Sequence, residues 1–192
     1  MGTAQPIKNE EALREFTDYY RLTRPSARNY ALIIFSLNTA LRISDLLALK
    51  WENIYDFESE KMTKHLCIRE HKTGKISVIA LNSRIHAAVY FYMEERCPAK
   101  GEFLFSRNTS HTEPLCRTQA YRIIRKAAAE TLHLPNISCH SMRKTFGYHA
   151  WKQGTPPALL MDIYNHSTYA HTKRYLGIDQ DERDSVFLEV ML

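Results

Sequence analysis

The sequence lacks several features that define whole classes of protein. Its four cysteines are widely spaced, with no C-x-x-C pair and no Cys/His spacing typical of a zinc site. No apolar run approaches the roughly 20 residues that a bilayer-spanning helix needs. The first residues, MGTAQPIKNEE, contain no hydrophobic core of a signal peptide. We therefore expect a protein of the reducing cytoplasm, with no membrane partner and no bound metal.

The chain has enough apolar content to fold and a modest excess of positive charge. Hydrophobic residues make up 44% of its 192 residues, which is sufficient for one packed domain. Lysine and arginine number 26 against 21 acidic residues, so the formal net charge is +5 and the isoelectric point is near 9.0. This balance permits binding to a polyanion.

Helical spacing of apolar residues dominates the chain. The pattern predicts two opening helices over residues 10–22 and 26–39, and Ser44 and Asp45 can cap a further helix just after Arg42. An amphipathic helix over 117–132 has a basic outer face of Arg122, Arg125 and Lys126. Further helices are expected over 83–96, 141–153, 156–164 and 171–176. We predict a mainly α fold.

Short β-rich runs interrupt this pattern between the early and late helices. Residues 65–70 and 76–81 flank HKTGK, whose Gly74 favours a tight turn, so we expect an antiparallel hairpin with Lys72 at its tip. A short strand is expected near Tyr55, and residues 109–114 are predicted to be a loop. The fold class is therefore mainly α with a small antiparallel β-sheet.

The stretch from residue 140 to 175 gathers residue types suited to an anionic group. It contains His140, Arg143, His166 and Tyr175, at separations of 3, 23 and 9 residues. His140 lies one helical turn before Arg143, so both side chains face the same side. The spacing predicts one site built from several short helices.

A DNA phosphodiester is an anion on which these residues can do chemistry. Transesterification needs a nucleophile, a base, a proton donor for the leaving oxygen and fixed positive charge. Tyr175 is the candidate nucleophile, and its phenol, with an ordinary pKa of about 10, needs a base such as His140. Arg143 and Arg42 can present planar forks to two phosphoryl oxygens. Lys72 is placed to reach the leaving 5′ oxygen. No carboxylate cluster for Mg²⁺ stands beside these basic residues, which favours metal-free chemistry.

These segments resemble the catalytic domain of the tyrosine recombinases, the phage integrase family, from about residue 28 to 177. ALRISDLLALKW resembles the first-arginine motif, HKTGK the hairpin-lysine motif, HSMR the H-x-x-R box and NHSTYAHTKRY the end of the catalytic motif. Asn165 stands where the family usually has glycine, and asparagine also tolerates the left-handed turn. The resemblance assigns these six catalytic positions: Arg42, Lys72, His140, Arg143, His166 and Tyr175.

The resemblance implies a site-specific DNA recombinase that forms a 3′-phosphotyrosyl intermediate without ATP, metal or other cofactor. It also implies duplex DNA as partner, a homotetramer on two DNA sites, and an accessory DNA-bending or directionality protein. We treat residues 1–192 as one catalytic domain, with 1–25 as an N-terminal extension and 178–192 as a C-terminal tail. The short length resembles that of the fimbrial-switch invertases of the family, which lack its N-terminal DNA-clamping domain.

Several alternatives stay open from the sequence. Tyr169 is the rival nucleophile but is expected to pack instead. His149 and His171 are taken as bystanders, with the alternative that His171, four residues before Tyr175, approaches the site. Asp45 is a structural residue that orients Arg42. Lys75 is a weaker candidate than Lys72 and is assigned, with the basic helix face, to DNA binding. The tail closes its own core or docks on a neighbouring protomer. For the whole chain, the alternatives are a type IB-like topoisomerase and a catalytically inactive DNA-binding regulator with the same fold.

Overall fold

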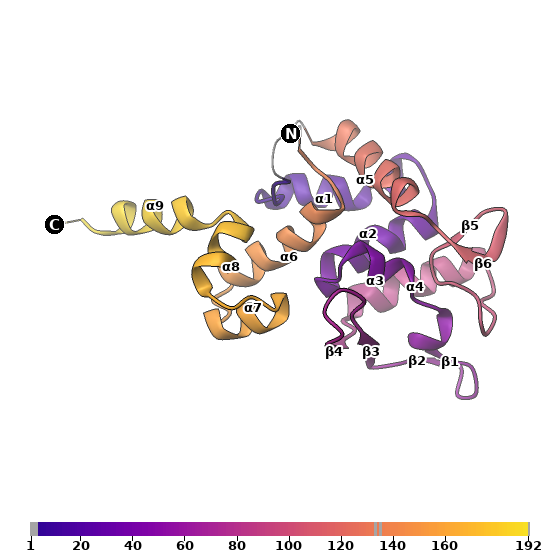
Figure 1. Cartoon of the computed structure of the whole chain (residues 1–192). Coiled ribbons are helices and arrows are strands. Elements are labelled where there is room, and N and C mark those ends of the chain that lie inside the picture. Colours follow the sequence, from indigo (N-terminus) through magenta and orange to yellow (C-terminus); the bar gives the residue numbers. More distant parts are fainter. Residues whose placement is uncertain (1–3, 133, 135, 192) are drawn as a thin grey trace.

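A computed structural model describes residues 4–132, 134 and 136–191, and its helices surround one buried central helix (Figure 1). This helix is α2 (Ala27–Thr39), which buries residues all round its circumference, including Leu32, Ile33 and Phe35. A helix that is apolar on every side packs in the interior. It contacts α1 (Glu10–Asp18), α4 (Ser83–Glu95) and α6 (Cys139–Lys152).

Short helices and turns join these larger elements. A π-helical turn, η1 (Tyr19–Thr23), continues α1, and the short α3 (Ile43–Leu47) and 3-10 helix η2 (Trp51–Asn53) follow α2. Beyond α5 (Arg117–Thr131) and α6 come α7 (Pro157–Tyr164), α8 (Tyr169–Leu176) and α9 (Asp179–Glu189). Within the described ranges, no helix is both long and apolar enough to cross a lipid bilayer.

The β structure consists of two-stranded antiparallel ladders. The predicted hairpin is present as β3 (His65–Arg69) and β4 (Ile76–Ala80), with Cys67 opposite Val78. The strand expected near Tyr55 is β1 (Tyr55–Asp56), paired with β2 (Lys61–Met62). The prediction of a loop over 109–114 was wrong, because β6 (Ser110–Pro114) pairs with β5 (Ser106–Arg107). Its polar, exposed side chains give none of the alternation that marks a half-buried strand.

Helix boundaries follow local chemistry. Asn9, Asn82 and Thr168 accept hydrogen bonds from backbone N–H groups in the first turns of α1, α4 and α8. The prediction that Ser44 and Asp45 cap the third helix was wrong: Arg42 is the N-cap residue and α3 begins at Ile43. The helices α6, α7 and α8 share a small apolar core around Tyr148, Tyr164 and Leu176.

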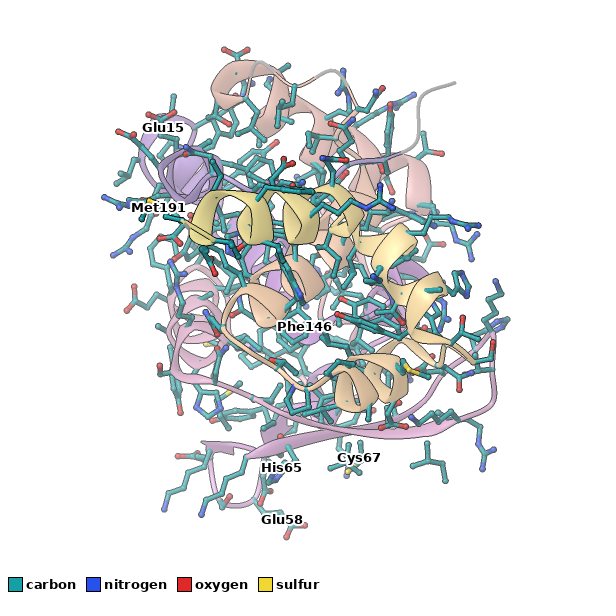
Figure 2. All side chains as sticks on the ribbon, turned by 90° about the vertical axis from the view of Figure 1, so that its left-hand side faces the viewer. Glu15, Glu58, His65, Cys67, Phe146 and Met191 are labelled. Atoms are coloured by element: carbon teal, nitrogen blue, oxygen red, sulfur yellow. The ribbon has the colours of Figure 1, made fainter. Side chains whose placement is uncertain are left out.

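The last helix projects from the body of the protein (Figure 1). It lies in the foreground of Figure 2, and Lys8 anchors its first turn through an ion pair with Asp181 at 2.6 Å. Further along, Phe187 and Leu188 are 82% and 78% exposed. The tail therefore packs in the core only at its start, where Ile178 is buried, and these apolar residues of α9 remain exposed. The predicted extension over 1–25 and tail over 178–192 include residues 1–3 and 192, which lie outside the described residues.

Candidate active site

A cavity of about 740 Å³ brings together the residues predicted from five separate segments. They come from the α2–α3 connection, the β3–β4 loop, α6, the α7–α8 turn and α8. All six predicted catalytic residues line this cavity: Arg42, Lys72, His140, Arg143, His166 and Tyr175. Residues that are 133 positions apart in the chain, Arg42 and Tyr175, thus share one surface.

Arg143 forms the floor of the cavity, with only 6% of its surface exposed. Its Nη1 donates a hydrogen bond to the carbonyl of Ala40, which ends α2 in a left-handed conformation with φ of 53°. The guanidinium carbon lies 4.6 Å from the centre of the Tyr164 ring, and the Tyr164 hydroxyl donates to the backbone carbonyl of Arg143 at 2.7 Å. A buried cation is thus held in place by an aromatic face and a carbonyl.

Arg42 is the N-cap residue of α3, and its Nη1 forms an ion pair with the carboxylate of Glu70. The carboxylate of Asp45, which the sequence suggested would orient Arg42, instead accepts a hydrogen bond from the backbone N–H of His71 at 2.9 Å. The carboxylate that holds Arg42 is therefore that of Glu70. Asp45 fixes the neighbouring hairpin loop.

Lys72 is exposed at the tip of the β3–β4 hairpin and faces the cavity, whereas Lys75 turns aside. The ammonium group of Lys75 pairs with the carboxylate of Asp162 at 2.6 Å and also donates to the Asp162 carbonyl at 3.0 Å. Asp162 is 71% exposed, so the pair lies at the surface, where a phosphate would compete with Asp162 for the Lys75 ammonium group. The two lysines of the hairpin therefore differ in position: Lys72 lines the cavity, and Lys75 is paired with Asp162.

Tyr175 lies half-buried on α8 between the other aromatic side chains of the site. The centre of its ring is 5.4 Å from that of Tyr164 and 5.2 Å from that of His166. Desolvation raises the pKa of its phenol above 10.0, and the charges of Arg143 and Arg42 partly offset this rise. The phenol is thus neutral in the free protein, and its ionisation requires a base. Tyr169, the rival, is not among the residues that line the cavity.

His166 follows the turn that ends α7, where Asn165 adopts φ of 54°. The asparagine therefore keeps the left-handed turn predicted for it. The Nδ1 atom of His166 lies 3.1 Å from the hydroxyl of Thr172, and its ring stacks on His171 with centres 4.1 Å apart. Desolvation, followed by repulsion from His171 and Arg143, lowers the pKa of His166 to about 4. Its imidazole is therefore neutral at pH 7.

His140 stands at the solvent-exposed mouth of the cavity, one turn before Arg143 on α6. Partial desolvation, followed by repulsion from Lys144 and Arg143, lowers the pKa of its imidazole below 6.5. A neutral imidazole can accept a proton, which is the property that a base for Tyr175 needs.

The residues assigned to DNA binding on α5 lie outside the cavity, on the helix whose first residue, Arg117, lines it. Arg122 and Lys126 are exposed and lie four residues apart, so they share one face. With a rise of about 1.5 Å per residue, this face begins roughly 8 Å along the helix from Arg117. At about 100° per residue, Arg122 and Lys126 point to a different side of α5 from Arg117, and their contact with DNA stays a prediction.

Sequence reasoning missed several residues that the fold adds to the site. Glu70 follows Leu66 and Ile68 on the inward-facing side of β3, so a charge at an apolar position was the available signal. His171 was judged a bystander, yet it lines the cavity and stacks on His166. Lys144 places its ammonium group 5.1 Å from the centre of the Tyr175 ring.

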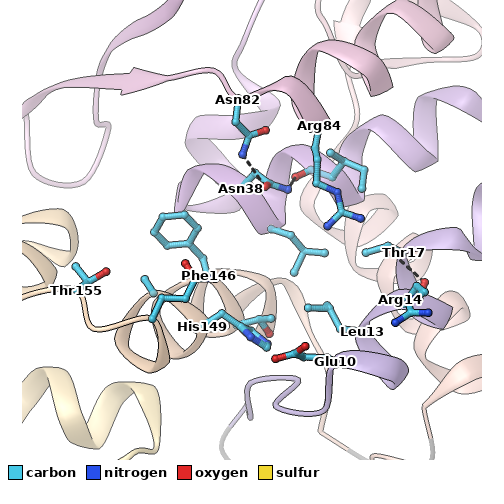
Figure 3. A pocket seen from close by; sticks show the side chains of 15 residues that line it. Glu10, Leu13, Arg14, Thr17, Asn38, Asn82, Arg84, Phe146, His149 and Thr155 are labelled. Atoms are coloured by element: carbon cyan, nitrogen blue, oxygen red, sulfur yellow. Dashed lines mark hydrogen bonds between the residues drawn. The ribbon is translucent and has the colours of Figure 1, made fainter.

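A second cavity, of about 690 Å³, lies between α1, α2 and α6 (Figure 3). Two of the residues that line it, Asn82 and Asn38, are joined by a hydrogen bond of 2.9 Å from the Asn82 side-chain amide to Oδ1 of Asn38 (Figure 3). His149 also lines the cavity, and its Nε2 lies 3.0 Å from the carbonyl oxygen of Ile7. None of the six predicted catalytic residues lines it. The candidate catalytic residues therefore share the first cavity and not the second.

The fold is that of tyrosine recombinase catalytic domains. The structure of XerA recombinase superimposes with a TM-score of 0.76 at 17% sequence identity, covering 100% of this chain and 67% of the XerA chain. XerH recombinase bound to its difH substrate matches with a TM-score of 0.71 at 19% identity, covering 96% of this chain and 54% of the XerH chain. These identities establish the architecture alone.

Sequence comparison then assigns the chain to a family. The phage integrase family model matches residues 8–182, and the chain belongs to this family. It is 38% identical over 181 residues to the probable integrase/recombinase YoeC of Bacillus subtilis (strain 168), covering 94% of this chain and 93% of YoeC. It is also 32% identical to the type 1 fimbriae regulatory protein FimE of Escherichia coli (strain K12), covering 78% and 74% of the two chains.

Proposed function

We propose that this protein is a site-specific DNA recombinase that cuts and rejoins strands through a covalent 3′-phosphotyrosyl intermediate. The observation that carries the proposal is the convergence of all six family motif positions, from five segments, on one cationic cavity. Family membership and the fold support the same conclusion.

In the proposed cleavage step, the Tyr175 oxygen attacks the phosphorus and the bond from phosphorus to the 5′ oxygen breaks. His140 accepts the phenol proton, and its lowered pKa leaves it free to do so at neutral pH. Lys72 donates a proton to the departing 5′ oxygen. The products are a phosphotyrosyl link and a free 5′ hydroxyl, and attack by another 5′ hydroxyl reverses the step.

Three further groups stabilise the charge that develops on the phosphoryl oxygens. Arg143 and Arg42 supply permanent charge from fixed positions, and such preorganised donors are effective because they need not reorient during the reaction. His166, neutral at pH 7, has one ring N–H, and with Nδ1 accepting from the Thr172 hydroxyl this N–H is on Nε2 and donates to a phosphoryl oxygen. The arginines thus fill the charge-neutralising role that metal ions have in many nucleases.

The proposed partner is duplex DNA, bound by four protomers on two sites within the cytoplasm. Solved relatives include XerH on a DNA substrate and a Tn1549 integrase on circular-intermediate DNA. For this chain we assign the exposed face of α5, together with Lys75, to phosphate contacts. We also propose that the exposed apolar residues of α9 dock on a neighbouring protomer, and that an accessory DNA-bending or directionality protein acts with the tetramer.

The experiment that tests the proposal does not require a known target. A pool of nicked duplexes with a randomised centre is incubated with the protein, and DNA that stays attached in detergent is recovered and sequenced. Wild-type protein is expected to retain DNA of one recurrent sequence, because strand loss at the nick traps the covalent link. Tyr175→Phe is expected to retain none, and Tyr169→Phe to behave as wild type.

The same experiment separates the alternatives. A type IB-like topoisomerase would retain DNA without sequence preference and relax a supercoiled plasmid lacking the selected site. A regulator that has kept only the fold would bind DNA without any detergent-stable product. This alternative is retained because the relative FimE is named as a regulatory protein. A plasmid carrying two selected sites should recombine only if the main proposal holds.

A further inference from the structure

Glu70 is a buried carboxylate at the end of β3, with 5% of its surface exposed. It continues the inward-facing side of the strand after Leu66 and Ile68. Removing a carboxylate from water is costly unless other groups bind it, so its partners define its role. Burial alone would raise the pKa of Glu70, but hydrogen bonds from Ser77 and Arg42 outweigh it and hold the pKa below its ordinary value.

The side chain of Glu70 joins two parts of the candidate site. Its Oε1 accepts a hydrogen bond from the Ser77 hydroxyl at 2.9 Å. Its Oε2 accepts one from the Thr73 hydroxyl at 3.2 Å and another from Nη1 of Arg42. Thr73 directly follows Lys72, so one carboxylate holds both the first arginine and the lysine loop.

The backbone of Glu70 closes that loop. Its N–H donates to the carbonyl of Lys75 at 2.8 Å, and its carbonyl accepts from the N–H of Gly74, also at 2.8 Å. Gly74 has φ of 68°, a conformation that glycine adopts without strain, so the four-residue tip can fold back on Glu70. A second link, from the His71 N–H to Asp45 at 2.9 Å, ties the tip to α3.

We propose that Glu70 is a positioning residue that sets the distance and orientation between Arg42 and the loop carrying Lys72. The inference rests on the proposed function, because it assigns Glu70 to the same cleavage step. Glu70 couples the charge that binds the phosphoryl oxygens to the donor that protonates the leaving oxygen. A guanidinium has five N–H donors, so Arg42 binds Glu70 through one nitrogen and turns others to the phosphate.

A different role would make Glu70 an inhibitor that occupies the phosphate-binding arginine until DNA displaces it. The contacts favour positioning, because Glu70 keeps other partners besides Arg42: Ser77 on Oε1, Thr73 on Oε2 and two backbone hydrogen bonds. A carboxylate fixed in this way does not swing aside when a phosphate arrives. The two roles predict opposite effects of removing Glu70.

The test measures covalent-complex formation on a nicked duplex of the sequence that wild-type protein selects. Two versions are used: the ordinary duplex, and one with sulfur replacing the 5′ bridging oxygen of the scissile phosphate. Sulfur leaves without a proton, so the ratio of the two rates reports how well the proton donor is placed. The variants are Glu70→Ala, Glu70→Gln, Lys72→Ala and Arg42→Ala. The control is Glu113→Ala, which breaks a remote hairpin pair between Arg107 and Glu113 at 2.7 Å.

We expect Glu70→Ala to slow cleavage of the ordinary duplex by about 100-fold, on the scale of a misplaced general acid, and Glu70→Gln to slow it less. The sulfur-to-oxygen ratio should rise by about tenfold or more in Glu70→Ala and Lys72→Ala, and stay near wild type in Arg42→Ala and Glu113→Ala. The double variant Glu70→Ala/Lys72→Ala should show the same sulfur-to-oxygen ratio as Lys72→Ala, because both substitutions impair the same step, the protonation of the leaving oxygen by Lys72.

Two results would overturn the inference. If the sulfur-to-oxygen ratio in Glu70→Ala equals that of wild type, whatever the melting temperature of the variant, Glu70 is a purely structural residue. Faster cleavage by Glu70→Ala or Glu70→Gln would show an inhibitor. Failure of the proposed function is distinguishable, because wild-type protein would then form no covalent complex on either duplex.

Discussion

At Gly147, α6 lies close to side chains of both α7 and α8, so Gly147→Ala probes the packing beneath the site. A Cβ placed there would lie 2.5 Å from Cδ2 of Leu176, 2.5 Å from the hydroxyl oxygen of Tyr164 and 2.9 Å from its Cζ. Ordinary carbon contacts lie near 3.5–4.0 Å, so roughly 1 Å of space must open. The Tyr164 ring is the larger obstacle, and it also packs against Arg143 and Tyr175.

Two opposing effects set the change in the free energy of unfolding. Alanine is better than glycine inside a helix by about 0.8–1 kcal/mol. Overpacking a well-filled core costs about 1–3 kcal/mol. The net loss is therefore about 0–2 kcal/mol, or a fall of roughly 0–8 °C in the melting temperature of a chain of this size. The protein should still fold.

The effect on cleavage is expected to be much larger than the effect on stability. A displacement of the Tyr164 ring shifts the aromatic surface against which Tyr175 and Arg143 lie, and misplacing a reacting group by about 1 Å costs about 100-fold in rate. The assay is the rate of covalent-complex formation on the selected nicked duplex, paired with a thermal melt of each variant.

The controls isolate each contribution. Ala150→Gly, on the same helix but beside the second cavity, should lose about 1 kcal/mol of stability through helix propensity while cleavage stays at the wild-type rate. Adding Tyr164→Phe to Gly147→Ala removes one of the close contacts and should restore part of the rate. Wild-type cleavage by Gly147→Ala, with a melting temperature raised by the propensity gain, would refute the packing account.

Three other outcomes are expected. Tyr164→Phe removes the hydroxyl that binds the Arg143 carbonyl but keeps the ring. In denaturant titrations its free energy of unfolding should fall by about 1–3 kcal/mol, and its loss of cleavage should be smaller than that of Gly147→Ala. A variant as stable as wild type would contradict this expectation. In NMR titrations of the folded protein, the His166 imidazole should protonate near pH 4. Because the unfolded state binds that proton at a higher pH, the contribution of His166 to stability should be complete above about pH 6.5 and diminish as the pH falls. A titration midpoint near 6.5 in the folded protein would contradict this expectation. Arg122→Ala should weaken DNA binding across sequences and reduce the slope of log K against log salt by about 1; an unchanged slope would remove Arg122 from the interface.

The helices and the cavity residues were predictable because their signals are local or regularly spaced. Apolar periodicity marked α2 and α5, and His140 lies one turn from Arg143 in any helix that contains both. Asn165 was expected to keep a left-handed turn, and its φ of 54° confirms that prediction. Local backbone preference was sufficient in these places.

Other features depend on contacts that spacing does not encode. The pairing of Glu70 with Arg42 crosses 28 residues and depends on how the hairpin packs on α3, so the sequence suggested the nearer Asp45 instead. His171 approaches His166 because α8 turns back after Asn165. The strand β6 consists of polar, largely exposed residues that pair across a short turn, and it carries none of the alternation that reveals a strand.

Tyr175 is the residue proposed to form the covalent bond to DNA, and this assignment can be tested directly. Trypsin cleaves after Lys173 and Arg174, so Tyr169 and Tyr175 fall in different peptides, and mass spectrometry of the digested, nuclease-trimmed complex can locate the attached nucleotide. We expect a nucleotide joined through its 3′ phosphate to Tyr175 and to no other residue. A nucleotide on Tyr169, or a complex that still forms with Tyr175→Phe, would contradict it.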